Sequence, residues 1–139
     1  MMKLEKILNK YNFPKQATHN AFDFEEIEQI ISFPLPEDYK YFLNNFVEHE
    51  CLLGAEYLRL WDINSLLVHN KGYEIQKYLT NTLAIGTDMG GGCIAIELVE
   101  ETSYRIVLME FIGLDYPIEI GSSFTDMLKR LDNGQEWFN

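Results

Sequence analysis

A glycine-rich segment between two apolar runs constrains the fold of this chain more than any other feature. The first run ends at Gly86, the second begins at Cys93, and residues 87–92 between them hold Asp88 and three consecutive glycines. Glycine reaches positive φ without steric cost, so the segment predicts a tight reversal between two strands.

Consecutive glycines can also cradle a phosphate, but the spacing here does not fit such a site. The P-loop needs a lysine after its last glycine, and the dinucleotide fingerprint needs G-x-G-x-x-G before a helix. Neither pattern occurs, a strand is expected where the helix would begin, and Asp88 would repel an anion. We therefore interpret the segment as a strand-connecting turn and expect no cofactor.

Apolar residues recur at helical spacing in the first third of the chain. Asp23 followed by Glu26 resembles a capping box that opens a short helix, and Pro34 ends it. Pro36 opens the clearest helix, over residues 36–46. The spacing i, i+3, i+4, i+7 is met by Leu4, Ile7, Leu8 and Tyr11, and again by Tyr39, Phe42, Leu43 and Phe46.

The second half of the chain favours strands, followed by one last helix. Asp62 can cap a helix after the first strand, and Ser122 or Ser123 can cap the last helix, which Asn133-Gly134 closes. The order predicts an α+β domain over residues 1–139, with a single mixed, mostly antiparallel sheet flanked by helices. The expected strands are 56–61, 82–86, 93–99, 104–110 and about 117–120.

Composition places the chain among cytoplasmic globular domains. Its 139 residues are 47% apolar, yet no uncharged apolar stretch approaches the ~20 residues that a membrane span requires. The N-terminus lacks the apolar core of a signal peptide. Cys51 and Cys93 lie far apart in the sequence, and in a reducing compartment we expect both to be free thiols.

The net charge of −11 is unevenly distributed along the sequence. Residues 1–20 carry +3, whereas residues 78–128 hold one base, Arg105, against eight acids. Nucleic-acid binding needs a basic face, so we expect neither a nucleic-acid partner nor a membrane. An electrostatically steered partner should be cationic, although a solvated acidic surface would explain the same charges.

The sequence shows no arrangement of residues that requires catalysis or a metal. His49, Cys51 and Cys93 supply three potential zinc ligands with one short spacing, whereas structural zinc takes four. Both cysteines have apolar neighbours, and no serine or threonine lies in a nucleophile motif. We expect no catalytic residues and no metal site.

Four segments in order resemble the SUKH superfamily, shared by fungal Smi/Knr cell-wall regulators and many bacterial immunity proteins. The chain departs from the family pattern at residues 44–48, where an Asn-Gly turn is usual. The resemblance covers about residues 24–132. The matching segments are Leu35-Pro36-Glu37-Asp38-Tyr39 with Phe42-Leu43, Leu60-Trp61 with Asn70 and Tyr73, Ile85-Gly86-Thr87-Asp88 through Gly92, and Ser123-Phe124-Thr125-Asp126-Met127-Leu128.

The resemblance implies a non-enzymatic immunity protein, a monomer or weak homodimer, that neutralises a cognate toxin. The alternative is a cell-wall-type regulatory scaffold or small-ligand domain without a toxin partner. The family's matching residues look architectural, so no active site is transferred to this chain. We expect an acidic face to bind a basic toxin domain, with a nuclease as the first guess. The candidate partner-binding residues are Asp88, Glu97, Glu100, Glu101, Glu110, Asp115 and Trp137.

Overall fold

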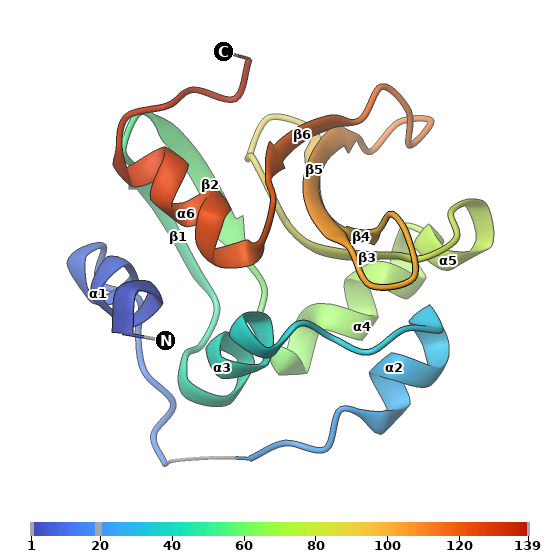
Figure 1. Ribbon diagram of the computed structural model, residues 1–139, viewed down its shortest axis with the longest axis horizontal. Helices are drawn as coiled ribbons and strands as arrows, with labels where there is room; N and C mark the ends of the chain where they lie inside the picture. Colours follow the sequence, from blue (N-terminus) through green and yellow to red (C-terminus); the bar gives the residue numbers. More distant parts are fainter. Residues whose placement is uncertain (1, 19–20, 139) are drawn as a thin grey trace.

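A computed structural model describes residues 2–18 and 21–138 of the chain as six helices and six strands (Figure 1). The helices are α1 (Met2–Lys10), α2 (Glu25–Ile31), α3 (Glu37–Asn45), α4 (Ile63–Gly72), α5 (Ile75–Tyr78) and α6 (Phe124–Asp132). The strands are β1 (His49–Leu53), β2 (Glu56–Leu60), β3 (Thr82–Thr87), β4 (Gly92–Leu98), β5 (Tyr104–Glu110) and β6 (Ile118–Gly121). None of these helices is long and apolar enough to cross a membrane.

The strands form one sheet in the order β1-β2-β3-β4-β5-β6, and every neighbouring pair is antiparallel. This confirms the α+β class, with an antiparallel meander where a mixed, mostly antiparallel sheet was expected. The glycine segment connects β3 to β4, as predicted from its composition. Of the expected elements, the strands near 82–86, 93–99, 104–110 and 117–120 are all present within one or two residues.

The pairing between β2 and β3 is the shortest in the sheet. It consists of Arg59 with Thr87 and Leu60 with Gly86. A side chain at Gly86 would place its Cβ 2.2 Å from the carbonyl oxygen of Arg59, so only glycine allows this approach. The register shifts between Ala84 and Gly86, which is typical of a β-bulge. Strand bulges bend sheets, and this one lies where the β1–β2 hairpin joins the rest.

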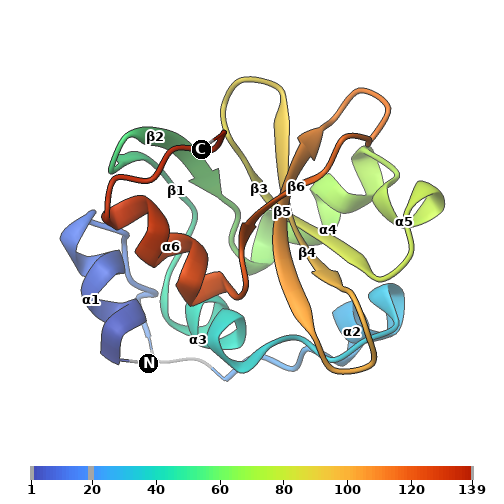
Figure 2. The same ribbon diagram turned by 45° about the horizontal axis from the view of Figure 1, so that its top comes forward.

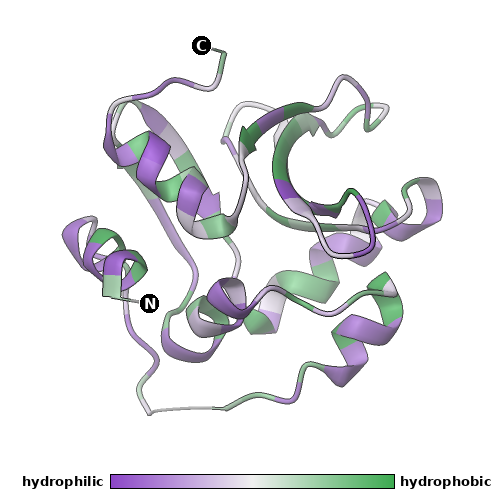
Figure 3. Ribbon diagram, in the orientation of Figure 1, coloured by the Kyte–Doolittle hydropathy of each residue, from purple (hydrophilic) through white to green (hydrophobic). Residues whose placement is uncertain are grey.

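The sheet curls around α6, which contacts both edge strands, β1 and β6 (Figure 2). The buried face of α6 carries Phe124, Met127, Leu128 and Leu131, the residues predicted from its periodicity. Phe124 packs against the rings of Tyr39 and Phe42 from α3, with centroids 5.2 and 5.3 Å away. Hydropathy follows this layout: the inner strands β4 and β5 are strongly hydrophobic, and α6 is amphipathic (Figure 3).

On another side, α4 and α5 pack against β3 through the fully buried Asn70. Its Nδ2 donates to the carbonyl oxygens of Leu66 and Ala84, both at 2.8 Å. Its Oδ1 accepts from the Ala84 amide at 2.9 Å and from Gln76 Nε2 at 3.0 Å. All four hydrogen bonds of the amide are made, so Asn70 fixes two helices to the sheet without an unpaired polar atom.

Two of the expected helix caps form, and one does not. Asp62 accepts from the Asn64 amide at 3.0 Å, and Ser123 accepts from the Asp126 amide at 2.9 Å. The capping box predicted for Asp23 and Glu26 is wrong, because the Asp23 carboxylate instead accepts from the Glu25 amide at 2.9 Å. Phe24 occupies the N-cap position of α2 and makes no side-chain cap.

Strand β1 was not expected from the sequence. Its residues alternate in exposure until Leu53, which is fully buried, and the strand pairs along its whole length with β2. The outward positions hold Glu50 and Leu52, both exposed, so the segment lacks a clean alternation of apolar and polar residues. Pairing with β2, rather than local pattern, makes this segment a strand.

Candidate functional site

A groove of about 660 Å³ opens at the end of the sheet where β3 turns into β4 and β5 turns into β6. Both connecting loops project from the same end of the sheet (Figure 2). The Phe111 amide donates to the Gly91 carbonyl oxygen at 3.0 Å and so ties the two loops together. The lining residues are Asp88, Gly90, Gly91, Gly92, Leu108, Met109, Glu110, Phe111, Ile112, Tyr116, Ile118 and Phe138.

One wall of the groove is the glycine turn, which the Asp88 carboxylate holds in shape. Its Oδ1 accepts from the amides of Gly90 at 2.8 Å and Gly92 at 2.7 Å. A Cβ at Gly92 would lie 2.5 Å from Asp88 Oδ2 and would displace this carboxylate, and Gly91 has φ +94°, which strains other residues. Gly91 and Gly92 therefore suit the turn, and the Asp88 carboxylate lies at the groove.

The opposite wall and rim are apolar and exposed. The exposed fractions of Ile112, Tyr116 and Phe138 are 89%, 79% and 82%. Phe111 is held from behind by Tyr73 at the end of α4, because the two rings stack with centroids 4.0 Å apart. Grouped large apolar side chains on a surface mark an interaction site, whereas single ones do not.

Backbone conformation also distinguishes this end of the sheet. Among the described non-glycine residues, seven have positive φ, and the three with apolar or aromatic side chains all lie in these two loops. They are Met89, Leu114 and Tyr116, with φ of 69°, 49° and 57°. Such a conformation is unfavourable for bulky residues and is found preferentially where ligands bind.

The charges around the groove are all negative. Asp88 and Glu110 line it, and Asp115 lies in the same loop as Tyr116. Glu110 and Asp115 are exposed, and neither forms an ion pair within the described part of the chain. Among the described residues that line the groove, none is lysine, arginine or histidine. Apolar surface and uncompensated carboxylates therefore lie side by side.

The structure divides the acidic residues that the sequence analysis grouped on one face. Asp88 and Glu110 line the groove, and Asp115 lies in the β5–β6 loop at the same end of the sheet, whereas Glu100 and Glu101 lie in the β4–β5 connection at the other end of β4. The two ends are separated by the seven-residue strand β4, which is about 20 Å long.

Glu97, also grouped with these acids, is paired with a cation. Its Oε1 accepts from Arg105 Nε at 2.8 Å across the β4–β5 pair, so its charge is compensated within the sheet. Only three of the six candidate carboxylates are therefore gathered at one place.

Trp137 is a packing residue, and its neighbour Phe138 reaches the groove. Trp137 is only 8% exposed, and its amide donates to Glu56 Oε2 at 2.7 Å. Of this aromatic pair, Trp137 was the predicted partner-binding residue, and it is the buried one. Ile112 and Tyr116 were missed as well, because isolated apolar residues in a loop carry no periodic signal.

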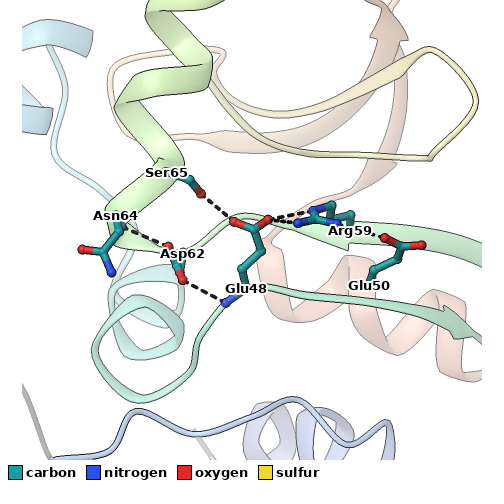
Figure 4. A network of polar contacts seen from close by, with 6 residues as sticks. All are labelled: Glu48, Glu50, Arg59, Asp62, Asn64 and Ser65. Carbon is teal, nitrogen blue, oxygen red and sulfur yellow. Dashed lines mark hydrogen bonds and ion pairs between the residues drawn. The ribbon is translucent and has the colours of Figure 1, made fainter.

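A second polar cluster, around Glu48, connects neighbouring segments of the fold (Figure 4). Glu48 forms an ion pair with Arg59 and accepts from Ser65 Oγ at 2.6 Å, while its amide donates to Asp62 Oδ2 at 3.2 Å. Arg59 also donates to Glu50 Oε1 at 3.0 Å. Burial alone would raise the pKa of Glu48, but the hydrogen bonds from Ser65 and Arg59 outweigh it and lower the pKa. The members of the cluster therefore bond to one another and connect β1, β2 and α4.

The thiols are unsuited to nucleophilic chemistry. Burial raises the pKa of Cys51 to about 11. Burial and, secondarily, the Asp88 charge raise the pKa of Cys93 to about 12. Both thiols are therefore protonated at neutral pH and unreactive. Across residues 2–18 and 21–138, no group of three histidine, cysteine, aspartate or glutamate side chains is placed to hold a metal ion.

Residues 20–130 match the SMI1 / KNR4 family (SUKH-1). The chain belongs to the SMI1 / KNR4 family (SUKH-1). This confirms the resemblance to the SUKH superfamily. A search of curated proteins gives no match. Both groove loops of this SUKH-1 protein lie within the matched range, whereas Phe138 lies beyond it.

Proposed function

We propose that this SUKH-1 protein is a non-enzymatic immunity module that neutralises a toxin domain by binding it. The observation that carries the proposal is the groove, which joins exposed aromatic and aliphatic side chains with unpaired carboxylates. Exposed aromatic anchors beside charged groups are typical of protein-binding surfaces.

Neutralisation would proceed by occlusion of the toxin's own site. A nuclease presents a basic groove to its nucleic-acid substrate, and Glu110, Asp115 and Asp88 can complement such a surface. Phe138, Tyr116 and Ile112 would then exclude water around these charges. The net charge of −11 would speed the encounter of the immunity protein with a cationic partner.

Stoichiometry separates this proposal from an enzymatic mode of protection. We expect the toxin domain encoded beside this gene to lose activity in proportion to the immunity protein added, with complete inhibition at one equivalent. The measurement is a titration of toxin activity, with the mass of the recovered toxin determined afterwards. Inhibition by a small fraction of an equivalent, or a change in toxin mass, would contradict occlusion. Full toxin activity at excess immunity protein would favour a regulatory role instead.

A further inference from the structure

We infer that the groove binds one large apolar side chain of the partner. Lysine or arginine lies next to that side chain in the partner. The inference rests on the proposed function and specifies its partner chemistry. It combines three features of one place: an apolar floor, carboxylates without cations, and loops that are held in position.

The floor of the groove accepts an apolar group. Leu108 and Ile118 are paired across β5 and β6, and Phe111 is fixed by stacking on Tyr73. A volume of about 660 Å³ lies within the roughly 300–1,000 Å³ of ordinary binding pockets. The groove therefore has room for a tryptophan, phenylalanine or leucine side chain together with its neighbouring backbone.

The rim selects cationic neighbours for that side chain. Asp88 and Glu110 line the groove, Asp115 adds a third negative charge in the adjoining loop, and no described residue of the lining is basic. Lysine or arginine beside the anchor would meet these carboxylates in a partly desolvated setting, whereas glutamate or aspartate would be repelled. Charge thus determines which apolar segment binds.

The groove is also preorganised. The Gly91–Phe111 hydrogen bond fixes the two loops relative to one another, and Asp88 fixes the glycine turn. The docked Trp137 positions the tail that carries Phe138. A site that needs little ordering on binding retains more of its interaction energy as affinity.

Defined peptides test the inference without any toxin. We would titrate labelled full-length protein with the hexapeptide Lys-Lys-Trp-Leu-Lys-Lys and follow backbone amides by NMR. Shifts should concentrate at the amides of residues 88–92, 108–112, 116, 118 and 138. The matched peptides Glu-Glu-Trp-Leu-Glu-Glu and Lys-Lys-Ala-Ser-Lys-Lys should each bind at least about tenfold more weakly. Equal binding of all three peptides, or shifts spread over the whole surface, would overturn the inference.

Matched charge reversals test the same surface in the protein. The pair Glu110→Lys and Asp115→Lys should weaken binding of the cationic peptide at least about tenfold. The pair Glu100→Lys and Glu101→Lys changes the net charge equally at the far end of β4 and should cost less than about threefold. Equal losses of peptide binding in the two double variants would mean that only the net charge matters. The groove would then not be the binding site.

Matched truncations test the apolar anchor contacts. Ile112→Ser and Phe138→Ala remove exposed groove side chains. Combined in one variant, they should weaken binding of the cationic peptide about tenfold. Val68→Ser and Tyr78→Ala remove similarly exposed side chains outside the groove and serve as controls. If the toxin is neutralised equally well by the groove variants and the wild type, the proposed function stands and this inference fails. If the peptide binds in the groove but no toxin is neutralised, the site stands and the proposed function fails.

Discussion

At the scale of single residues, two buried polar side chains differ in whether they form hydrogen bonds. Asn70 makes all four of its hydrogen bonds, whereas the hydroxyl of Tyr39 is fully buried and makes none within the described residues. An unpaired buried polar atom costs free energy, whereas a fully bonded one holds its neighbours in place. Substitutions at the two positions should therefore change the free energy of unfolding in opposite directions.

Asn70→Ala should lower the free energy of unfolding by about 3 kcal/mol, because it removes four hydrogen bonds, among them those of the Ala84 amide and carbonyl, and opens a cavity. Asn64→Ala on the exposed side of the same helix is the control and should cost less than about 0.5 kcal/mol. Urea denaturation followed by circular dichroism measures both. Equal effects at the two positions would contradict the anchoring role.

Tyr39→Phe should leave the free energy of unfolding unchanged or raise it by about 0.5–1 kcal/mol, since it removes only an unpaired hydroxyl. Tyr11→Phe is the matched comparison. The Tyr11 hydroxyl donates to Asp132 at 2.7 Å, and we expect its loss to cost about 1 kcal/mol. Thermal unfolding of both variants provides the test, and a clear loss of stability in Tyr39→Phe would refute the assignment.

At the scale of elements, the cluster around Glu48 connects three segments that are distant along the chain. It joins the residue before β1 to Arg59 in β2 and to Ser65 in α4. The pKa of Glu48 is lower in the folded protein than its ordinary value of about 4.5. The cluster therefore stabilises the fold above that value, and this contribution is lost as the pH falls through the folded pKa.

Glu48→Gln should remove this pH-dependent contribution. At pH 7 the variant should be less stable than wild type by about 1 kcal/mol, and the difference should shrink toward zero as the pH falls through the lowered pKa of Glu48. Unfolding measured by urea at several pH values between 3 and 7 gives the comparison. A constant difference across that range would show that Glu48 acts by packing alone.

Local pattern predicted most elements, and tertiary context explains those it missed. The strands β3, β4 and β5 are near-continuous apolar runs, and α3 and α6 have clean helical periodicity, so their existence could be read from the sequence. Strand β1 lacked such a pattern because its outward positions mix Glu50 with Leu52. The capping box at Asp23 failed because an alternative local hydrogen bond, to Glu25, was available.

At the scale of the whole molecule, the acidic character divides into separate regions. The sequence analysis treated residues 78–128 as one acidic block, but the antiparallel strands send successive turns to opposite ends of the sheet. The groove unites residues near 90, 110 and 138, which no local pattern connects. Only the topology of the sheet and the path of the C-terminal tail bring them together.

The central claim is that this SUKH-1 protein binds a toxin domain with the groove end of its sheet. The most direct measurement is hydrogen exchange of the protein alone and in complex with the toxin domain encoded beside its gene. We predict slowed exchange in residues 88–92 and 108–118, with little change in α1, α2 and the β4–β5 connection. Slowed exchange confined to those other segments, with the groove loops unaffected, would contradict the claim.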